Sequence, residues 1–170
     1  MVALAHLATA AAPPLIPAPD SDNAAERYLW LFQRADADLI DRCDRATPGP
    51  DGLAYEPTDL RSYTADDLRD ALLAHQEWIA AIVETAKLPE CDFRLDTLPA
   101  RGPIPPDDPR SEYLSNFRKA SRVLIADAWR CWADGDRQGG VDRIAALCHM
   151  VEDLTGRRGS ATHHIVAASV

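Results

Sequence analysis

Hydrophobic residues recur every three or four positions along several stretches of the chain, a period that is typical of one face of an α-helix. This pattern predicts helices over about residues 24–41, 65–86, 110–133, 137–154 and 161–170. Alternating runs of β-branched and aromatic residues, which would indicate strands, do not occur in the sequence. We therefore expect an all-α protein.

Residues that favour helix starts stand where these helices are predicted to begin. Asn23 can cap the first helix, with Glu26 placed as its capping-box partner. Thr64 can cap the second helix, and Asp108 followed by Pro109 is a strong start signal for the third.

The prolines mark the connections between the first three helices. All thirteen lie at or before Pro109, in clusters at 13–19, 48–57 and 89–109. Proline lacks the backbone donor and fixes φ, so these clusters predict loops. The last loop carries the apolar residues Phe93, Leu95 and Ile104, and we expect it to pack against the helices.

The spacing of apolar residues also predicts which face of each helix is buried. On the helix at 110–133 the predicted face is wide, and this helix is expected to be the most buried. Its main stripe is Tyr113, Phe117, Ala120, Leu124, Ala128 and Cys131. The expected stripe of the helix at 137–154 is Val141, Ile144, Ala145, Cys148 and Val151. His75 lies on the apolar stripe of the helix at 65–86, where a hydrogen-bonded core histidine is expected.

The last two long helices are joined by the short sequence Ala133-Asp134-Gly135-Asp136, and the second of them opens with Gly139-Gly140. This unit resembles the helix-turn-helix of a tetratricopeptide repeat, in which a Gly-Asp turn joins two helices. The resemblance implies that Gly135 and Asp136 form the turn.

The same resemblance implies roles in packing. Ala128 and Gly140 would be the small residues at which the two helices cross, and Ile144 would be a bulky apolar residue packed between helices. The sequence departs from the repeat pattern at Cys131, where an aromatic residue is usual, and at Leu147, where alanine is usual.

Three short motifs extend this likeness over about residues 22–170. They are Asp22-Asn23-Ala24-Ala25 with Tyr28, then Cys91-Asp92-Phe93, then Gly135-Asp136. Together they are similar to a group of uncharacterised bacterial all-helical proteins with such repeats. The resemblance implies an array of antiparallel helical hairpins with long Pro-rich loops, and none of its motifs is catalytic.

The charge balance narrows the classes of partner. The chain has 18 Lys and Arg against 27 Asp and Glu, a formal net charge of -9. Nucleic-acid binding, including a helix-turn-helix DNA binder, is disfavoured because it requires clustered basic residues. No apolar run approaches the length of a membrane span.

One domain is expected at 22–170, after a Pro/Ala-rich tail at 1–21. The first dozen residues are apolar and small, and they fit either a degenerate signal peptide or an unstructured tail. The stretch lacks the basic residues with which a signal peptide begins, so a cytoplasmic location is slightly favoured. If the stretch is a signal peptide, the protein is exported.

Candidate chemistry is sparse. His149 and the adjacent pair His163-His164 do not have the spacing of helical metal ligands, because neighbouring residues point to different faces. The four cysteines contain no C-x-x-C motif. We therefore predict no catalytic, cofactor-binding or metal-binding residue.

These observations favour a non-enzymatic helical module that binds a protein or peptide partner, or a scaffold within a larger assembly. The alternative is an enzyme or small-ligand binder with a pocket between the helices and the Pro-rich loops. The chain ends in the apolar run 165–170 without a capping signal. We expect an incomplete last helix, an exposed apolar face and self-association through the C-terminal helices.

Overall fold

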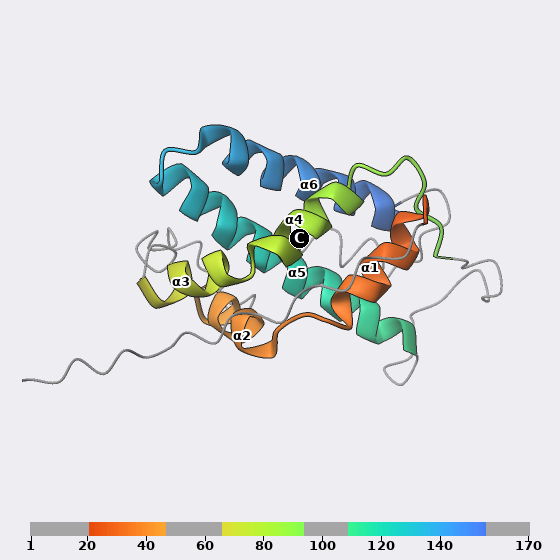
Figure 1. The fold of residues 1–170 in the computed structure, drawn as a ribbon. Helices are drawn as coiled ribbons and strands as arrows, with labels where there is room; N and C mark the ends of the chain where they lie inside the picture. The colour runs from red at the N-terminus through yellow and green to blue at the C-terminus, as the bar shows by residue number, and fades with distance from the viewer. Residues whose placement is uncertain (1–20, 47–65, 94–108, 156–170) are drawn as a thin grey trace, which may run out of the picture.

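The computed structural model describes residues 21–46, 66–93 and 109–155, and this part of the chain is all-helical. Its helices are α1 (Ala24–Phe32), α2 (Ala37–Ala46), α3 (Asp66–Ala74), α4 (Gln76–Thr85), α5 (Pro109–Ala133) and α6 (Arg137–Thr155) (Figure 1). The all-α prediction is confirmed for these residues, and α5 and α6 match the helices predicted at 110–133 and 137–154. No described helix is long and apolar enough to cross a membrane.

The prediction of a single helix at 24–41 is wrong, because the helical structure is interrupted between α1 and α2 (Figure 1). Asp36 causes the break. Its carboxylate accepts hydrogen bonds from the backbone N–H groups of Asp38 at 2.8 Å and Leu39 at 3.0 Å, so it caps a new helix. The Leu39 hydrogen bond, opposed by burial, holds the pKa of Asp36 below its usual value.

The helix predicted at 65–86 is also divided, at His75, into α3 and α4. The His75 N–H bonds to the Leu72 carbonyl at 3.2 Å, a tighter turn than an α-helix makes. Its imidazole Nδ1 lies 2.8 Å from the Ala71 carbonyl oxygen, and its Nε2 lies 3.5 Å from Asp36. His75 is thus hydrogen-bonded and half-buried, and the two helix breaks lie against each other.

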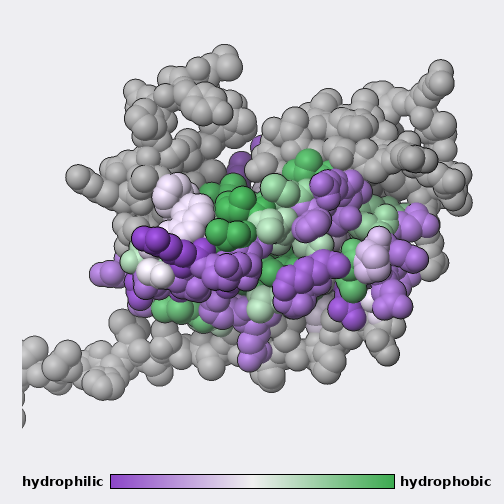
Figure 2. Space-filling model, turned by 90° about the horizontal axis from the view of Figure 1, so that it is seen from above, coloured by the Kyte–Doolittle hydropathy of each residue, from purple (hydrophilic) through white to green (hydrophobic). Residues whose placement is uncertain are grey.

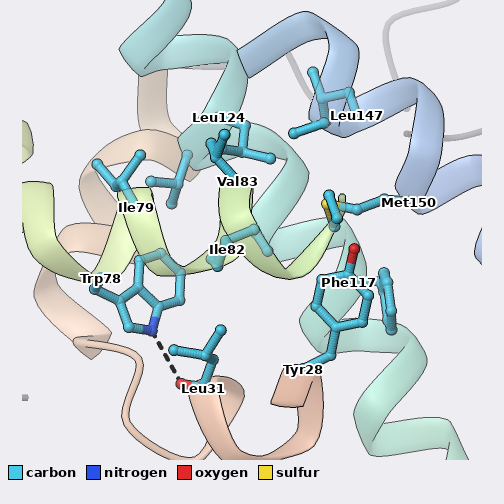
Figure 3. Close-up of a cluster of buried hydrophobic side chains, with 14 of the residues drawn as sticks. Tyr28, Leu31, Trp78, Ile79, Ile82, Val83, Phe117, Leu124, Leu147 and Met150 are labelled. Carbon is cyan, nitrogen blue, oxygen red and sulfur yellow. Dashed lines mark hydrogen bonds between the residues drawn. The ribbon is translucent and has the colours of Figure 1, made fainter. Parts of the chain in front are cut away.

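Helix α5 is the centre of the fold. It contacts α1, α2, α3 and α6, and α4 packs between α1 and α6. The predicted face of α5 is buried over its described part, and the core side chains come from all six of the helices named above. The largest buried side chains include Leu39 and Leu72 and, labelled in Figure 3, Tyr28, Leu31, Ile79, Ile82, Phe117, Leu124 and Met150.

Aromatic side chains join α1 to α5 at one end of this core. The rings of Tyr28 and Phe32 meet Phe117 edge-on, with centroids 4.9 and 5.0 Å away. Phe93, from the segment after α4, adds a third edge contact at 5.7 Å. In Figure 3 the Trp78 indole donates to the Leu31 carbonyl at 3.0 Å, so its polar atom is satisfied inside the core.

The start of α1 is tied to the segment that follows α4. Asn23 caps α1, as predicted, by accepting from the Ala25 N–H at 3.1 Å. The same side chain accepts from the Asp92 N–H and donates to the Asp92 carbonyl, both at 2.9 Å. The structure therefore brings together two motifs that lie far apart in the sequence, Asn23-Ala24-Ala25 and Cys91-Asp92-Phe93.

Several predictions fall outside the described residues. They are the tail at 1–20, the cap at Thr64, the start signal at Asp108, the loop residues Leu95 and Ile104, the pair His163-His164 and the helix at 161–170. Phe93 is described, and it packs against the core as predicted for that loop.

Candidate functional site

The turn between α5 and α6 is built by the residues predicted for it. Gly135 has a φ of 81°, a conformation that glycine adopts without strain. Its N–H bonds to Trp132 at 3.1 Å and the Asp136 N–H bonds to Cys131 at 2.8 Å, which is the Schellman pattern of a helix end. Asp136 then caps α6 by accepting from the Gly139 N–H at 2.9 Å.

The small residues predicted at the helix crossing, Ala128 and Gly140, are both buried, but the neighbour of Gly140 is a tryptophan side chain. Ala128 is fully buried in α5. A Cβ atom added at Gly140 would collide with the indole of Trp132, whose Cδ1 would lie only 2.5 Å from it. Gly140 therefore makes room for Trp132, whose ring also meets Trp129 edge-on at 5.0 Å.

Of the stripe predicted for α6, only Val151 packs against the core. Ile144, expected to pack between helices, is 37% exposed, and Val141 is 51% exposed. Ala145 and Cys148 are also exposed. The buried residues of α6 are instead Gly139, Gly140, Ala146, Leu147, Met150 and Leu154.

This correction has a simple physical reason. Helix α6 carries two apolar stripes that lie side by side around its axis. The stripe of Leu147, Met150 and Leu154 has the larger unbranched or γ-branched side chains, and burying it against α5 and α4 removes more apolar area from water. The smaller stripe is left facing outward.

We call this second stripe, Val141, Ile144, Ala145 and Cys148, the outer face of α6. The helix lies along the upper edge of the molecule in Figure 1. Seen from above, green apolar side chains lie among purple polar ones near the middle of the coloured surface (Figure 2). Trp132, 36% exposed, adds an aromatic side chain beside Gly140, near the α5–α6 turn.

A buried polar network lies on the other side of the hairpin. Asp127 of α5 is fully buried, and each of its carboxylate oxygens accepts from an arginine. Arg130 Nε lies 2.6 Å from one oxygen and Arg143 Nε of α6 lies 2.8 Å from the other. Gln76 of α4 donates to the first oxygen at 2.9 Å and accepts from Arg143 at 3.2 Å.

The network reaches the surface at the hairpin turn. Arg130 Nη1 lies 3.0 Å from Asp134, which also pairs with Arg69 of α3. Burial acts to lower the pKa of Arg130, but the hydrogen bond and charge of Asp127 outweigh it, so the pKa is raised. Four helices are thereby joined by ion pairs and hydrogen bonds around one carboxylate.

A second inward-facing carboxylate lies near the end of α6. Asp153 accepts from the hydroxyl of the buried Tyr28 at 3.2 Å and is hydrogen-bonded to the thiol of Cys91. Burial raises the pKa of Asp153 to about 6, although the Tyr28 hydrogen bond lowers it. Burial, and next the charge of Asp153, raise the pKa of Tyr28 and of Cys91.

The four cysteines all lie within the described residues, and none forms a disulfide. Burial raises the pKa of the Cys43 thiol to about 12 and also raises that of Cys131. Together with Cys91, these thiols remain protonated at neutral pH, the opposite of what a nucleophilic cysteine requires. Cys148, predicted on the inner face of the hairpin, is exposed instead.

Among the described residues, no group of three or more His, Cys, Asp and Glu side chains could hold a metal ion. His149 is exposed and lies 3.2 Å from Glu152 one turn away.

Sequence reasoning missed both buried carboxylates. Asp127 falls within the predicted buried face of α5, and a charged residue there was a signal that partners must exist. The partner on the same helix, Arg130, follows at the i+3 position, but Arg143 and Gln76 could not be assigned from spacing alone.

Comparisons of this chain with protein-family models, with curated proteins and with solved structures found no match.

Proposed function

We propose that the chain is a non-enzymatic helical interaction module, and that the outer face of α6 binds a helical segment of a protein or peptide partner. The observation that carries this proposal is the exposure of Val141 and Ile144 on a helix whose opposite side is already packed. Apolar stripes of this kind are used for contact when they are not buried in the fold.

The partner's chemistry follows from the shape of the outer face. Val141, Ile144 and Cys148 are spaced by three and four residues, so they form one ridge along the helix. An amphipathic helix packs such a ridge against its own apolar positions at the same spacing. We therefore expect a helical partner and not an extended strand.

The tetratricopeptide-like arrangement is part of the same proposal. Helices α5 and α6 would form one hairpin of a stacked array, with the Gly135-Asp136 turn at its tip. In such arrays each hairpin covers the apolar face of its neighbour, so a face without a neighbour stays exposed. The outer face of α6 has that character.

The alternative, an enzyme or ligand pocket under the Pro-rich loops, has less support. Those loops lie outside the described residues. Among the described residues, the fully buried carboxylate of Asp127 has both oxygens bonded to arginines of the fold itself. The buried thiols have raised pKa values, as expected of packed residues.

Selection from a displayed library of helical peptides tests the proposal. We expect the full chain to enrich peptides with apolar residues at i, i+3, i+4 and i+7, and Val141→Asp to abolish their binding. Leu73→Asp is the matched control, because Leu73 is 44% exposed on α3, away from α6. Failure to enrich such peptides, or equal loss with both variants, would contradict the proposal.

A further inference from the structure

The outer face of α6 carries one charge at each end. Arg137, Val141, Ile144, Cys148 and Glu152 follow one another at intervals of four, three, four and four residues, so all five lie on the same side of the helix. Arg137 is the first residue of α6, and Glu152 lies in its last turn. Both side chains are exposed.

These charges stand at the unfavourable ends of the helix. The N-terminus of a helix favours anions and the C-terminus favours cations, and α6 has an arginine first and a glutamate last. Arg137 is therefore not explained by the stability of α6 itself, and Glu152, which lies 3.2 Å from His149 on the same helix, is still 74% exposed.

The order of the charges is self-complementary when two α6 helices run antiparallel. With the two-fold axis between Ile144 and Ala145, Val141 of one copy meets Cys148 of the other. In the same register Arg137 meets Glu152 at both ends. The two charges are about 22 Å apart along the axis, from a rise of 1.5 Å per residue, so both pairs form in one alignment.

We propose that the partner of the outer face is a second copy of this chain, bound through an antiparallel α6–α6 contact with reciprocal Arg137–Glu152 pairs. This inference rests on the proposed function and names its partner. Ala145 at the centre lets the two helices approach closely, as small residues do at helix crossings. A two-fold contact of one patch with itself is the commonest form of homodimer.

The contact is expected to be weak. A stable interface buries about 800 Å² on each partner, and the outer face with Trp132 offers only five side chains at its centre. Association should therefore depend on protein concentration in the micromolar range or above, and the end charges should make it sensitive to salt.

Reversing the end charges tests this register by sedimentation velocity of the full chain at low salt. In Arg137→Glu each end contact becomes Glu against Glu, and in Glu152→Arg it becomes Arg against Arg. We expect each variant alone to dimerise about tenfold more weakly than the wild type. In an equimolar mixture both contacts become attractive, and association should return to within about threefold of the wild type.

The controls separate register from folding. Both reversals place charges favourably for the helix dipole, so the thermal stability of the folded chain should not fall. Arg45→Glu on α2 makes the same charge change at an exposed site and should leave dimerisation unaltered.

A wild-type chain that stays monomeric at about 1 mM would overturn the dimer, and so would a mixture no better than the single variants. Neither result would decide the proposed function, because the peptide selection tests it separately.

Discussion

Asp127 and Asp153 both point inward from the α5–α6 hairpin, but they are stabilised in different ways. Asp127 is fully buried and has two guanidinium groups, one on each carboxylate oxygen. Asp153 is half-buried and is bonded to a tyrosine hydroxyl and a thiol, which are neutral. One carboxylate has charged hydrogen-bond partners, and the hydrogen-bond partners of the other are neutral.

The difference shows what a buried carboxylate requires. Removing a charge from water costs several kcal/mol unless opposite charges and hydrogen bonds replace the solvent. Arginines on α5 and α6 supply that replacement for Asp127. Around Asp153 the nearest partners are dipoles, so burial raises its pKa to about 6 in place of an ordinary value of 3.8.

The largest expected effect is from Asp127→Asn. The variant leaves the buried Arg130 and the half-buried Arg143 facing a neutral amide, and loss of one partner from a buried ion pair costs about 3–5 kcal/mol. Urea unfolding followed by circular dichroism measures the change. The control is Asp41→Asn, which breaks an exposed pair with Arg45 on α2 and should cost less than about 0.5 kcal/mol. Equal losses in the two variants would refute the compensation described for Asp127.

Asp153→Asn should have a smaller effect that depends on pH. The folded-state pKa of Asp153 is raised, so the folded chain binds the proton more tightly than the unfolded chain. Its contribution to stability is full below pH 3.8 and is lost as pH rises through about 6. Asparagine does not ionise, so the variant should gain stability relative to the wild type between those values.

Unfolding of both chains at pH 4.5, 5.5 and 7.5 checks this difference, since effects of acid on the other groups are common to the two. Unfolding of Asp127→Asn and of the wild type over the same pH series gives the corresponding difference for the carboxylate that is paired with arginines. A difference between Asp153→Asn and wild type that stays constant with pH would show that Asp153 is not buried as described.

The smallest expected effect is from Tyr28→Phe. The Tyr28 hydrogen bond lowers the pKa of Asp153, so its removal should raise that pKa further above 6 and cost about 0.5–1.5 kcal/mol at neutral pH. Carbon-detected NMR titration of the Asp153 carboxyl measures the midpoint. An unchanged midpoint would mean that the hydroxyl does not reach the carboxylate in solution.

The sequence predicted the parts of the fold that local signals determine. The length of α5, the Gly135-Asp136 turn and the cap at Asn23 follow from periodicity, a glycine that tolerates positive φ and a side chain that bonds the backbone. The breaks at Asp36 and His75 were missed because a continuous apolar stripe crosses both. They depend on side chains that compete for backbone groups, and those contacts become visible only in three dimensions.

The candidate site was less predictable than the fold. Periodicity identified an apolar stripe on α6 but could not say which of two stripes faces the core, since that depends on the helices packed against it. The exposed apolar face predicted for the C-terminal helices was argued from residues 161–170, which lie outside the described residues; on α6 the exposed apolar residues are Val141 and Ile144, which were predicted to be buried. Partners separated by long stretches of chain, such as Tyr28 and Asp153, leave no signal in spacing.

The link between Asn23 and Asp92 has a consequence for the order of folding. It closes a loop with a sequence separation of 69 residues, whereas the α5–α6 turn joins its helices through three residues, Asp134, Gly135 and Asp136. Loop-closure entropy grows with the length of chain enclosed, so the hairpin forms at low entropic cost and the Asn23 link at a higher one. The hairpin is therefore the natural nucleus, and α1 joins it late, when the Asn23 side chain fastens the two ends of the N-terminal half to each other.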